Sequence, residues 1–230
     1  IIWSNIYIQI LKILRKSILK INIKKYIPKF LKIPLQKIKF LFLSSFALIQ
    51  WYQLSKKDLI KLELGSGSKK GDNGFTTVDI NGANISWDLK NGIPLKDNSV
   101  DLIYSSHLLE HIPFKELILF LKECKRILKN NGVFSVCVPN AGNYLNAYFK
   151  GETFENNYYP PALIETGSKI DQINYIAYMD GHHRYLFDEE NLINTLLTAG
   201  FKYAQLRKFD PNLDSKGRDY ESIYALAKKN

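Results

Sequence analysis

Short apolar runs alternate with helix-patterned segments from residue 58 to the end of the chain. The run Val133–Val138 is almost continuously apolar, which is typical of a strand buried on both faces of a parallel sheet. It follows a segment whose apolar residues recur at helical spacing. Strands that alternate with helices in this way predict a Rossmann-like, doubly wound α/β sheet, mostly parallel and of about seven strands.

Seven runs have the composition of strands and end at polar or turn-forming residues. They are Leu59–Leu64, Phe75–Ile80, Asn84–Trp87, Val100–Ser105, Val133–Val138, Phe201–Phe209 and Ser222–Ala227. One helix is predicted from Pro113 to a stop at Asn130-Asn131-Gly132, and another is capped by Asp188 and ended by Gly200. Ligands of such sheets bind at the carboxyl ends of the strands, so the polar residues there are the first candidates for a site.

The segment Gly65-Ser66-Gly67 directly follows the first predicted strand, where missing Cβ atoms let backbone amides approach a ligand. A dinucleotide site would use a similar loop. Glu63, however, would repel a pyrophosphate and favour a cationic amino acid or a sulfonium. Asp79 follows Gly65 by 14 residues, shorter than the spacing of about 20 in dinucleotide folds. Asp88 ends the third strand, where it could contact an adenine amino group, so S-adenosylmethionine is the predicted cofactor.

A set of motifs, taken in order, resembles class I S-adenosylmethionine-dependent methyltransferases of the type 11 group. The motifs are Leu62–Gly67, Val78-Asp79-Ile80, Ile93–Asp101, Ser105–His111, Asn131-Gly132-Val133, His183–Asp188 and Ala199-Gly200-Phe201. The resemblance covers about Asp58 to Lys228. It implies that Glu63, Gly65 and Gly67 face the methionine part of the cofactor. Asp79 would then contact the ribose, and Asp88 and Leu89 would contact the adenine. Ser105 and His107 would flank the sulfonium. Ser66 and Ile80 complete the predicted cofactor-binding set.

One segment departs from that family. Residues 68–74 are rich in glycine where most such enzymes place their first helix. Each glycine disfavours helix by roughly 1 kcal/mol, so a loop or a single turn is expected instead. Lys69 or Lys70 in this loop would then be placed to meet the cofactor carboxylate.

The segment His107-Leu108-Leu109-Glu110-His111 also matches the H-x-x-E-H signature of one class of zinc protease. The resemblance to methyltransferases explains these residues without a metal, and the sequence offers no third ligand. The match is therefore interpreted as coincidence, and no metal site is predicted.

A hydroxyl acceptor would need a general base, and the candidates are the histidines. His183 is the first choice and His107 the second. His183 follows the stretch Ala141–Asp180, which is interpreted as irregular, is rich in Tyr and Phe, and is predicted to form a substrate cap over the site. The alternative for His183 is a structural hydrogen bond in the core or a cap on the following helix.

Positive charge is concentrated at the start of the chain. Residues 1–57 contain 12 of the 32 Lys and Arg residues and no Asp or Glu, so the remainder carries 20 basic against 22 acidic side chains. Apolar and Lys residues alternate at helical spacing there, which predicts a basic amphipathic arm before a domain spanning residues 58–230. The arm would either bind the anionic inner surface of the membrane, or pack on the body of the protein or on a second subunit. No nucleic-acid motif is present.

These observations predict an enzyme that moves a methyl group to a small molecule, a sugar or a lipid-linked glycan, most simply by O-methylation. The chain has two cysteines, Cys124 in a helical pattern and Cys137 in a strand pattern, and no recognisable leader. Both observations favour a cytoplasmic protein. Three alternatives stay open. One is a homologue that binds S-adenosylmethionine without catalysis, and another is an NAD-dependent oxidoreductase on a similar sheet. The third is a peripheral membrane protein whose body is only structural.

Overall fold

The computed structural model describes residues 45–154 and 166–230, which contain a seven-stranded sheet with the order β3-β2-β1-β4-β5-β7-β6. The strands are β1 (Lys61–Leu64), β2 (Phe75–Asp79), β3 (Ile85–Ser86), β4 (Val100–Ser106), β5 (Leu128–Pro139), β6 (Tyr203–Leu206) and β7 (Ser222–Lys228). Strands β1 to β5 pair in parallel, whereas β7 runs antiparallel to both β5 and β6. The predicted mostly parallel α/β sheet is confirmed.

The direction of winding reverses between β1 and β4. Strands β1, β2 and β3 step toward one edge of the sheet, and β4 and β5 step toward the other. Loops that leave such a reversal point diverge and open a crevice at the carboxyl ends of the strands. The sheet therefore places the crevice beside Gly65, which follows β1, and beside the segment that follows β4.

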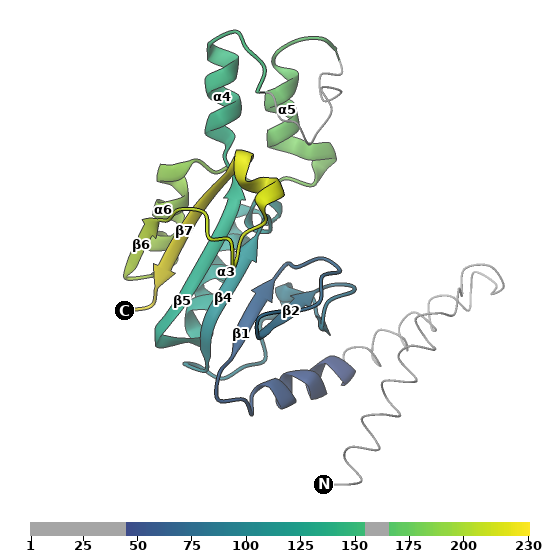
Figure 1. The fold of residues 1–230 in the computed structure, drawn as a ribbon, viewed down its shortest axis with the longest axis vertical. Coiled ribbons are helices and arrows are strands. Elements are labelled where there is room, and N and C mark those ends of the chain that lie inside the picture. The colour runs from purple at the N-terminus through teal and green to yellow at the C-terminus, as the bar shows by residue number, and fades with distance from the viewer. Residues whose placement is uncertain (1–44, 155–165) are drawn as a thin grey trace, which may run out of the picture.

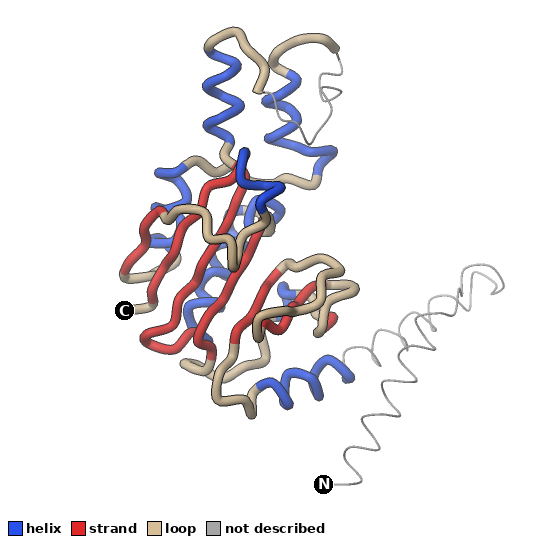
Figure 2. Tube along the Cα trace, in the orientation of Figure 1, coloured by secondary structure: helices blue, strands red, loops and turns tan. Residues whose placement is uncertain are grey.

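Two helices cover one face of the sheet, α3 (Phe114–Ile127) and α6 (Glu189–Thr198), as Figure 2 shows. Helix α6 begins as predicted, because the Asp188 carboxylate accepts a hydrogen bond from the Asn191 amide at 2.7 Å. Helix α3 ends earlier than predicted. Its last residue is Ile127 and β5 starts at Leu128, so the polar segment Asn130-Asn131-Gly132 lies inside the strand.

The opposite face of the sheet is crossed by the connection between β6 and β7 (Figure 1). Arg207 and Asp214 of this connection form an ion pair with side chains that are 11% and 0% exposed. The Arg207 guanidinium also donates to Ser135 Oγ of β5 at 3.0 Å, and the Tyr104 hydroxyl of β4 donates to Asp214 at 3.1 Å. This buried polar cluster holds the connection against the centre of the sheet.

Helices α4 (Ala141–Phe149) and α5 (Asp171–Tyr178) stand side by side above the carboxyl end of the sheet in Figure 1. The expectation of an irregular stretch was wrong over these residues. Asn140 caps α4 by accepting from the Gly142 amide at 2.9 Å. Tyr144 and Ile176 are buried between the two helices, forming a small core separate from the main one.

A helix at residues 45–54 packs on the body although it falls within the predicted basic arm. Ala47, Trp51 and Leu54 belong to the main core, and the Trp51 ring meets the Trp87 ring edge-on with centroids 6.3 Å apart. For this part of the arm, packing on the body is the observed arrangement. Residues 1–44 lie outside the described residues, so the arm and its boundary at residue 57 stay a prediction. Within the described residues, no helix is both long and apolar enough to cross a membrane.

Residues 68–74 form a loop without a helix, as predicted. Asn84 fixes this loop, because its side-chain oxygen accepts from the Gly71 amide at 2.9 Å and from the Thr77 hydroxyl at 2.8 Å. A Cβ on Gly71 would lie 1.9 Å from the carbonyl oxygen of Phe75, so only glycine fits there. The loop thus has one defined path despite its glycine content.

Candidate active site

A cleft of ≈ 610 Å³ opens at the carboxyl ends of β1, β2 and β3. A cavity of this volume is typical of sites for cofactors and small ligands. Of the predicted cofactor-binding residues, five line the cleft: Gly65, Asp79, Ile80, Asp88 and Leu89. The carboxyl ends of three neighbouring strands thus meet in one cleft, as the sequence predicts.

Asp79 joins the glycine loop to the cleft. Its Oδ2 atom accepts a hydrogen bond from the Gly67 amide at 2.8 Å, and the Gly65 amide donates to the Val78 carbonyl at 2.9 Å. Among the described residues, the Oδ1 atom of Asp79 has no donor of its own. One carboxylate oxygen therefore orders the loop, and the other is available to ligand hydroxyl groups.

Asp88 occupies the next strand end. Its side chain accepts from the Lys90 amide at 3.0 Å and so caps the short helix η2 (Leu89–Asn91). The alternative role of a strand-end cap is thus present in the structure, while Asp88 also lines the cleft.

Glu63 and the lysines of the following loop are arranged differently from the expectation. Glu63 is buried, and its carboxylate forms an ion pair with Lys69 Nζ at 3.1 Å. Lys70 Nζ donates to the carbonyl of Ala83 at 2.7 Å. Both lysines therefore hold the loop, and neither is among the residues that line the cleft.

Ser105 and His107, predicted to flank the sulfonium, do not line the cleft. Ser105 is fully buried. His107 has a left-handed backbone with φ 51°, and its Nε2 atom lies 2.9 Å from the hydroxyl of Ser222. Burial, with a contribution from Arg218, lowers the pKa of His107 to about 3, so this imidazole stays neutral. Its role at the cofactor stays a prediction.

The cleft contains further residues that sequence reasoning missed. They are Trp87, Lys90, Gly92, Leu108, His111, Ile112, Glu116, Leu119, Phe120 and Glu123. Apart from Trp87, which follows β3, the large apolar members come from the segment after β4 and from α3; of these, Leu108 lies in the motif Ser105–His111. Whether these side chains point into the cleft depends on how α3 packs against the sheet, and a local sequence pattern does not determine that packing.

Gly65 permits the close approach of the segment after β4. Its φ is +72°, and a Cβ at this position would lie 2.7 Å from a methyl carbon of Leu108. Because Leu108 lines the cleft, a larger residue at position 65 would displace one of its walls. The loop and the cleft wall are thus fitted to each other.

Replacing Gly65 with Ala is expected to destabilise the protein by roughly 2–3 kcal/mol, combining about 1–2 kcal/mol of left-handed strain with overpacking. It should also weaken ligand binding in the cleft. Gly67→Ala is the matched control, because Gly67 has φ +61° but no atom lies within 4 Å of the place where its Cβ would stand. Urea unfolding of both variants checks this; equal losses would show that the contact with Leu108 has no importance.

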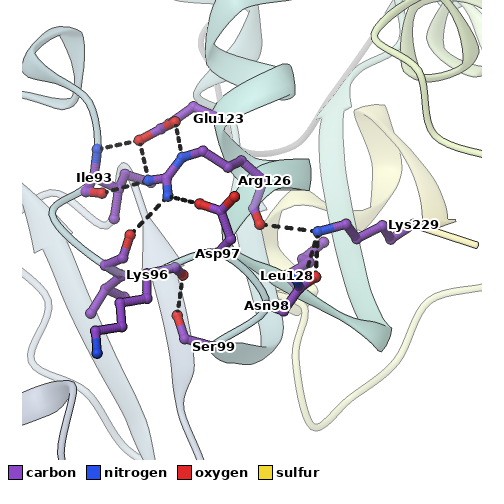
Figure 3. A network of polar contacts seen from close by, with 10 residues as sticks. Ile93, Lys96, Asp97, Asn98, Ser99, Glu123, Arg126, Leu128 and Lys229 are labelled. Atoms are coloured by element: carbon purple, nitrogen blue, oxygen red, sulfur yellow. Dashed lines mark hydrogen bonds and ion pairs between the residues drawn. The ribbon is translucent and has the colours of Figure 1, made fainter.

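The loop after η2, which includes Gly92 of the cleft wall, is held by Arg126 of α3 (Figure 3). The guanidinium donates to the carbonyls of Ile93 and Leu95 at 3.0 and 2.9 Å and to Asp97 at 2.6 Å. Glu123 completes the network by pairing with Arg126 at 2.7 Å and accepting from the Ile93 amide at 2.8 Å. The motif at residues 93–101 therefore has a structural reason, which is to anchor this loop on α3.

Replacing Arg126 with Ala is expected to lower the free energy of unfolding by about 1–2 kcal/mol, since the side chain is only partly buried and solvent replaces some of its partners. Binding in the cleft should weaken as well, because Gly92 and Glu123 line it. Arg126→Lys keeps the charge but not the fork of donors. Thermal unfolding of both variants checks the prediction, and a Lys variant as stable as the wild type would contradict it.

A second cavity, of ≈ 750 Å³, lies beside the first and shares Lys90 and His111 with it. Its other lining residues are Pro113, Gly181, His182 and Arg184. Gly181, His182 and Arg184 come just after the predicted cap of residues 141–180, so the segment that follows α5 forms part of this wall. His111 is therefore the histidine that borders both cavities.

His183, the predicted base, packs against His111 with ring centroids 5.1 Å apart. Backbone contacts bring the two together, because the amides of Arg184 and Tyr185 donate to the carbonyl of Glu110 at 2.7 and 3.1 Å. Burial lowers the pKa of His183, and burial raises the pKa of Glu110 to about 8. A buried carboxyl group and two imidazoles thus share one cluster at the edge of the second cavity.

Residues 62–136 match the family model described as a methyltransferase domain. Among solved structures, an S-adenosylmethionine-dependent methyltransferase from Aquifex aeolicus is 16% identical, with a TM-score of 0.45 over 80% of this chain and 88% of that one. Another from Archaeoglobus fulgidus is 17% identical, with a TM-score of 0.44 over 83% and 99%. Likenesses of this size give no information on the substrate. No match was found among curated proteins.

The matched segment contains the glycine loop, Asp79, Asp88, the segment after β4 and all of α3, and therefore every residue that lines the cleft. Residues 62–136 are thus similar to a methyltransferase domain, and the cleft lies within this segment. The cleft suits S-adenosylmethionine, since Asp79 and Asp88 form no ion pair among the described residues, whereas Glu116 pairs with Lys90 and Glu123 with Arg126. Such a wall attracts a sulfonium and disfavours the pyrophosphate of NAD.

Proposed function

With a methyltransferase domain over residues 62–136 as the premise, we propose that this chain methylates a hydroxyl group of a small molecule, a sugar or a lipid-linked glycan. The observation that carries the proposal is the second cavity, which shares Lys90 and His111 with the cofactor cleft. An acceptor bound there would lie next to the cofactor. Methyl transfer is an in-line displacement, for which such positioning provides much of the catalysis.

In this proposal Asp79 binds the ribose hydroxyls, Asp88 and Leu89 hold the adenine, and the backbone of Gly65, Ser66 and Gly67 receives the methionine part. Glu63 contributes indirectly, because its ion pair with Lys69 holds the loop in place. When bound, the cofactor supplies an electrophilic methyl group on a sulfonium. Asp79 and Asp88 line the same cleft as Gly65, which supports one continuous binding surface.

A hydroxyl acceptor loses its proton as its oxygen bonds to the methyl carbon, so a proton acceptor must lie near the acceptor cavity. We assign this role to the cluster of Glu110, His111 and His183, which keeps His183 as the predicted base with His111 as its neighbour at the cavity. The low pKa of His107 and its contact with Ser222 support a positioning role for that residue.

The helices α4 and α5 would then serve as the substrate cap predicted for residues 141–180. Leu145, Tyr148, Phe149 and Tyr178 are exposed on these helices, Phe149 to 81%. Exposed apolar and aromatic side chains on a substrate cap suit a substrate with an apolar or ring-containing part.

The experiment is a transfer assay with methyl-labelled S-adenosylmethionine and the full chain. Phenols, sugars and lipid-linked glycans are offered separately, and the label is traced by mass spectrometry to product. Labelled product together with equimolar S-adenosylhomocysteine supports the proposal, and His183→Gln should slow product formation without changing cofactor affinity. Cofactor binding with no turnover of any acceptor would favour the non-catalytic homologue.

We extend the proposal to a cytoplasmic location and to attachment to the inner membrane surface through residues 1–57, within which the helix at residues 45–54 packs on the body. The argument for attachment is the charge of this segment, which has 12 basic and no acidic residues. Co-sedimentation of the full chain with vesicles tests it. Binding to phosphatidylserine vesicles that is lost in high salt supports attachment, and equal recovery with uncharged vesicles or with none contradicts it.

A further inference from the structure

Glu110 is buried in a way that calls for a partner. It is 2% exposed, and among the described residues neither of its carboxylate oxygens receives a hydrogen bond. A buried carboxylate without donors is strongly unfavourable unless a cation or a proton compensates it. The groups around Glu110 therefore determine what it can bind.

The imidazoles of His111 and His183 each have one nitrogen with a free lone pair near Glu110. His111 Nδ1 lies 3.0 Å from the carbonyl of His182, and His183 Nδ1 lies 2.6 Å from the carbonyl of Ile176. A carbonyl only accepts, so both Nδ1 atoms carry the hydrogen and both Nε2 atoms are unprotonated in the neutral rings. This arrangement, in which one nitrogen is fixed by a backbone carbonyl and the other is free, is the usual one for histidines that bind metals.

The distances bring these atoms together. One ligand atom each from Glu110, His111 and His183 lies within 4.8 Å of the others. Glu110 Oε1 and His111 Nε2 are 3.6 Å apart, close to the edge of roughly 3.4 Å expected between two ligands of a tetrahedral zinc ion.

His107 is a further hydrogen-bond acceptor close to the Glu110 carboxylate. The hydroxyl of Ser222 donates to the carbonyl of Arg218 at 2.6 Å, so it accepts from His107 Nε2. The unprotonated Nδ1 of His107 then lies 3.8 Å from Glu110 Oε1. A carboxylate is thus surrounded by acceptor nitrogens, and one proton can satisfy only one of these contacts.

We propose that Glu110, His111 and His183 bind a divalent transition-metal ion. Two imidazoles and one carboxylate with a remaining open position are the ligand set of several catalytic zinc sites, whereas Mg²⁺ and Ca²⁺ prefer oxygen ligands alone. The side chain of His111 is 38% exposed, which gives an ion a route to the buried ligands. His183 is the third ligand that the sequence alone did not reveal.

The position of the metal site beside the acceptor cavity indicates a role in methyl transfer, and this role rests on the proposed function. His111 borders the acceptor cavity, so an ion bound to it would lie where an acceptor oxygen could take the open position. A bound cation lowers the pKa of an oxygen ligand. With the ion in place, the cluster would therefore act on the acceptor through the metal, and the hydroxyl proton would pass to solvent and not to the metal-bound nitrogens.

Metal binding is tested on the full chain without cofactor or acceptor. Zn²⁺ is titrated by calorimetry, and Co²⁺ is followed by the visible absorption that a four- or five-coordinate site produces. One equivalent is expected, with affinity at least about 100-fold weaker in Glu110→Gln, which keeps the shape but loses the charge. His111→Asn, at a partly exposed position, should show the same loss.

His182→Gln is the matched control, because the exposed His182 side chain is outside the cluster. It should bind Zn²⁺ like the wild type. Wild-type protein that binds neither ion, or binding unchanged in Glu110→Gln and His111→Asn, would overturn the proposal. S-adenosylhomocysteine binding is measured separately, and it should persist in Glu110→Gln. Its absence from the wild type would instead count against the proposed function.

Discussion

Replacing Asp214 with Asn is expected to lower the free energy of unfolding by about 3–5 kcal/mol, because it leaves the Arg207 guanidinium buried without its charge partner. Asp214 is fully buried, and it accepts hydrogen bonds from Arg207 at 2.5 and 2.7 Å, from Tyr104 at 3.1 Å and from the Asp210 amide at 2.7 Å. Asn can replace few of these contacts with its single acceptor oxygen. Urea unfolding followed by circular dichroism measures the loss.

Two further variants make this result specific. Glu116→Gln removes the exposed pair with Lys90, whose side chains are 49% and 72% exposed, and should change stability by less than about 1 kcal/mol. The double variant Arg207→Met/Asp214→Leu removes both charges and should be more stable than Asp214→Asn, although the Tyr104 hydroxyl and the Asp210 amide still lose their acceptor. If Asp214→Asn unfolds like the wild type, the buried pair does not hold the connection between β6 and β7.

Replacing Asp79 with Ala is expected to weaken binding of S-adenosylhomocysteine by about 100-fold. Hydrogen bonds from ligand hydroxyls to a charged carboxylate contribute about 1.5–3 kcal/mol each, and the loop amide of Gly67 also loses its acceptor. Asp79→Asn should show a smaller loss, because its amide oxygen can still accept from Gly67. Calorimetric titration of each variant measures the affinities.

The control for this variant is Asp72→Ala, which removes an exposed carboxylate from the neighbouring loop. Its affinity should stay within about twofold of the wild type, since the effect of an exposed charge is screened by solvent. An Asp79→Ala variant that binds as tightly as Asp72→Ala would rule out the ribose assignment.

The features that the sequence predicts well are local. The strand ends at Gly65, Asp79 and Asp88 follow from short apolar runs that stop at polar residues, and the cap of α6 follows from Asp188. The absence of a first helix at residues 68–74 follows from their glycine content. Each of these depends on a few neighbouring residues, which a sequence pattern contains.

The features that the sequence misses depend on long-range contacts. Helices α4 and α5 are short, and their shared core of Tyr144 and Ile176 joins segments far apart in the chain. His183 reaches Glu110 and His111 only because the amides after it pair with the Glu110 carbonyl. The Lys69 contact with Glu63 likewise depends on how the loop folds back over β1.

The most direct test of the central assignment is calorimetric titration of the full chain with S-adenosylhomocysteine and, in parallel, with NAD. The acidic cleft at β1, β2 and β3 predicts binding of one equivalent of S-adenosylhomocysteine, weakened in Asp79→Ala, and no measurable binding of NAD. Binding of NAD but not S-adenosylhomocysteine, or binding of neither by folded protein, would contradict the assignment of this cleft as a methyltransferase cofactor site.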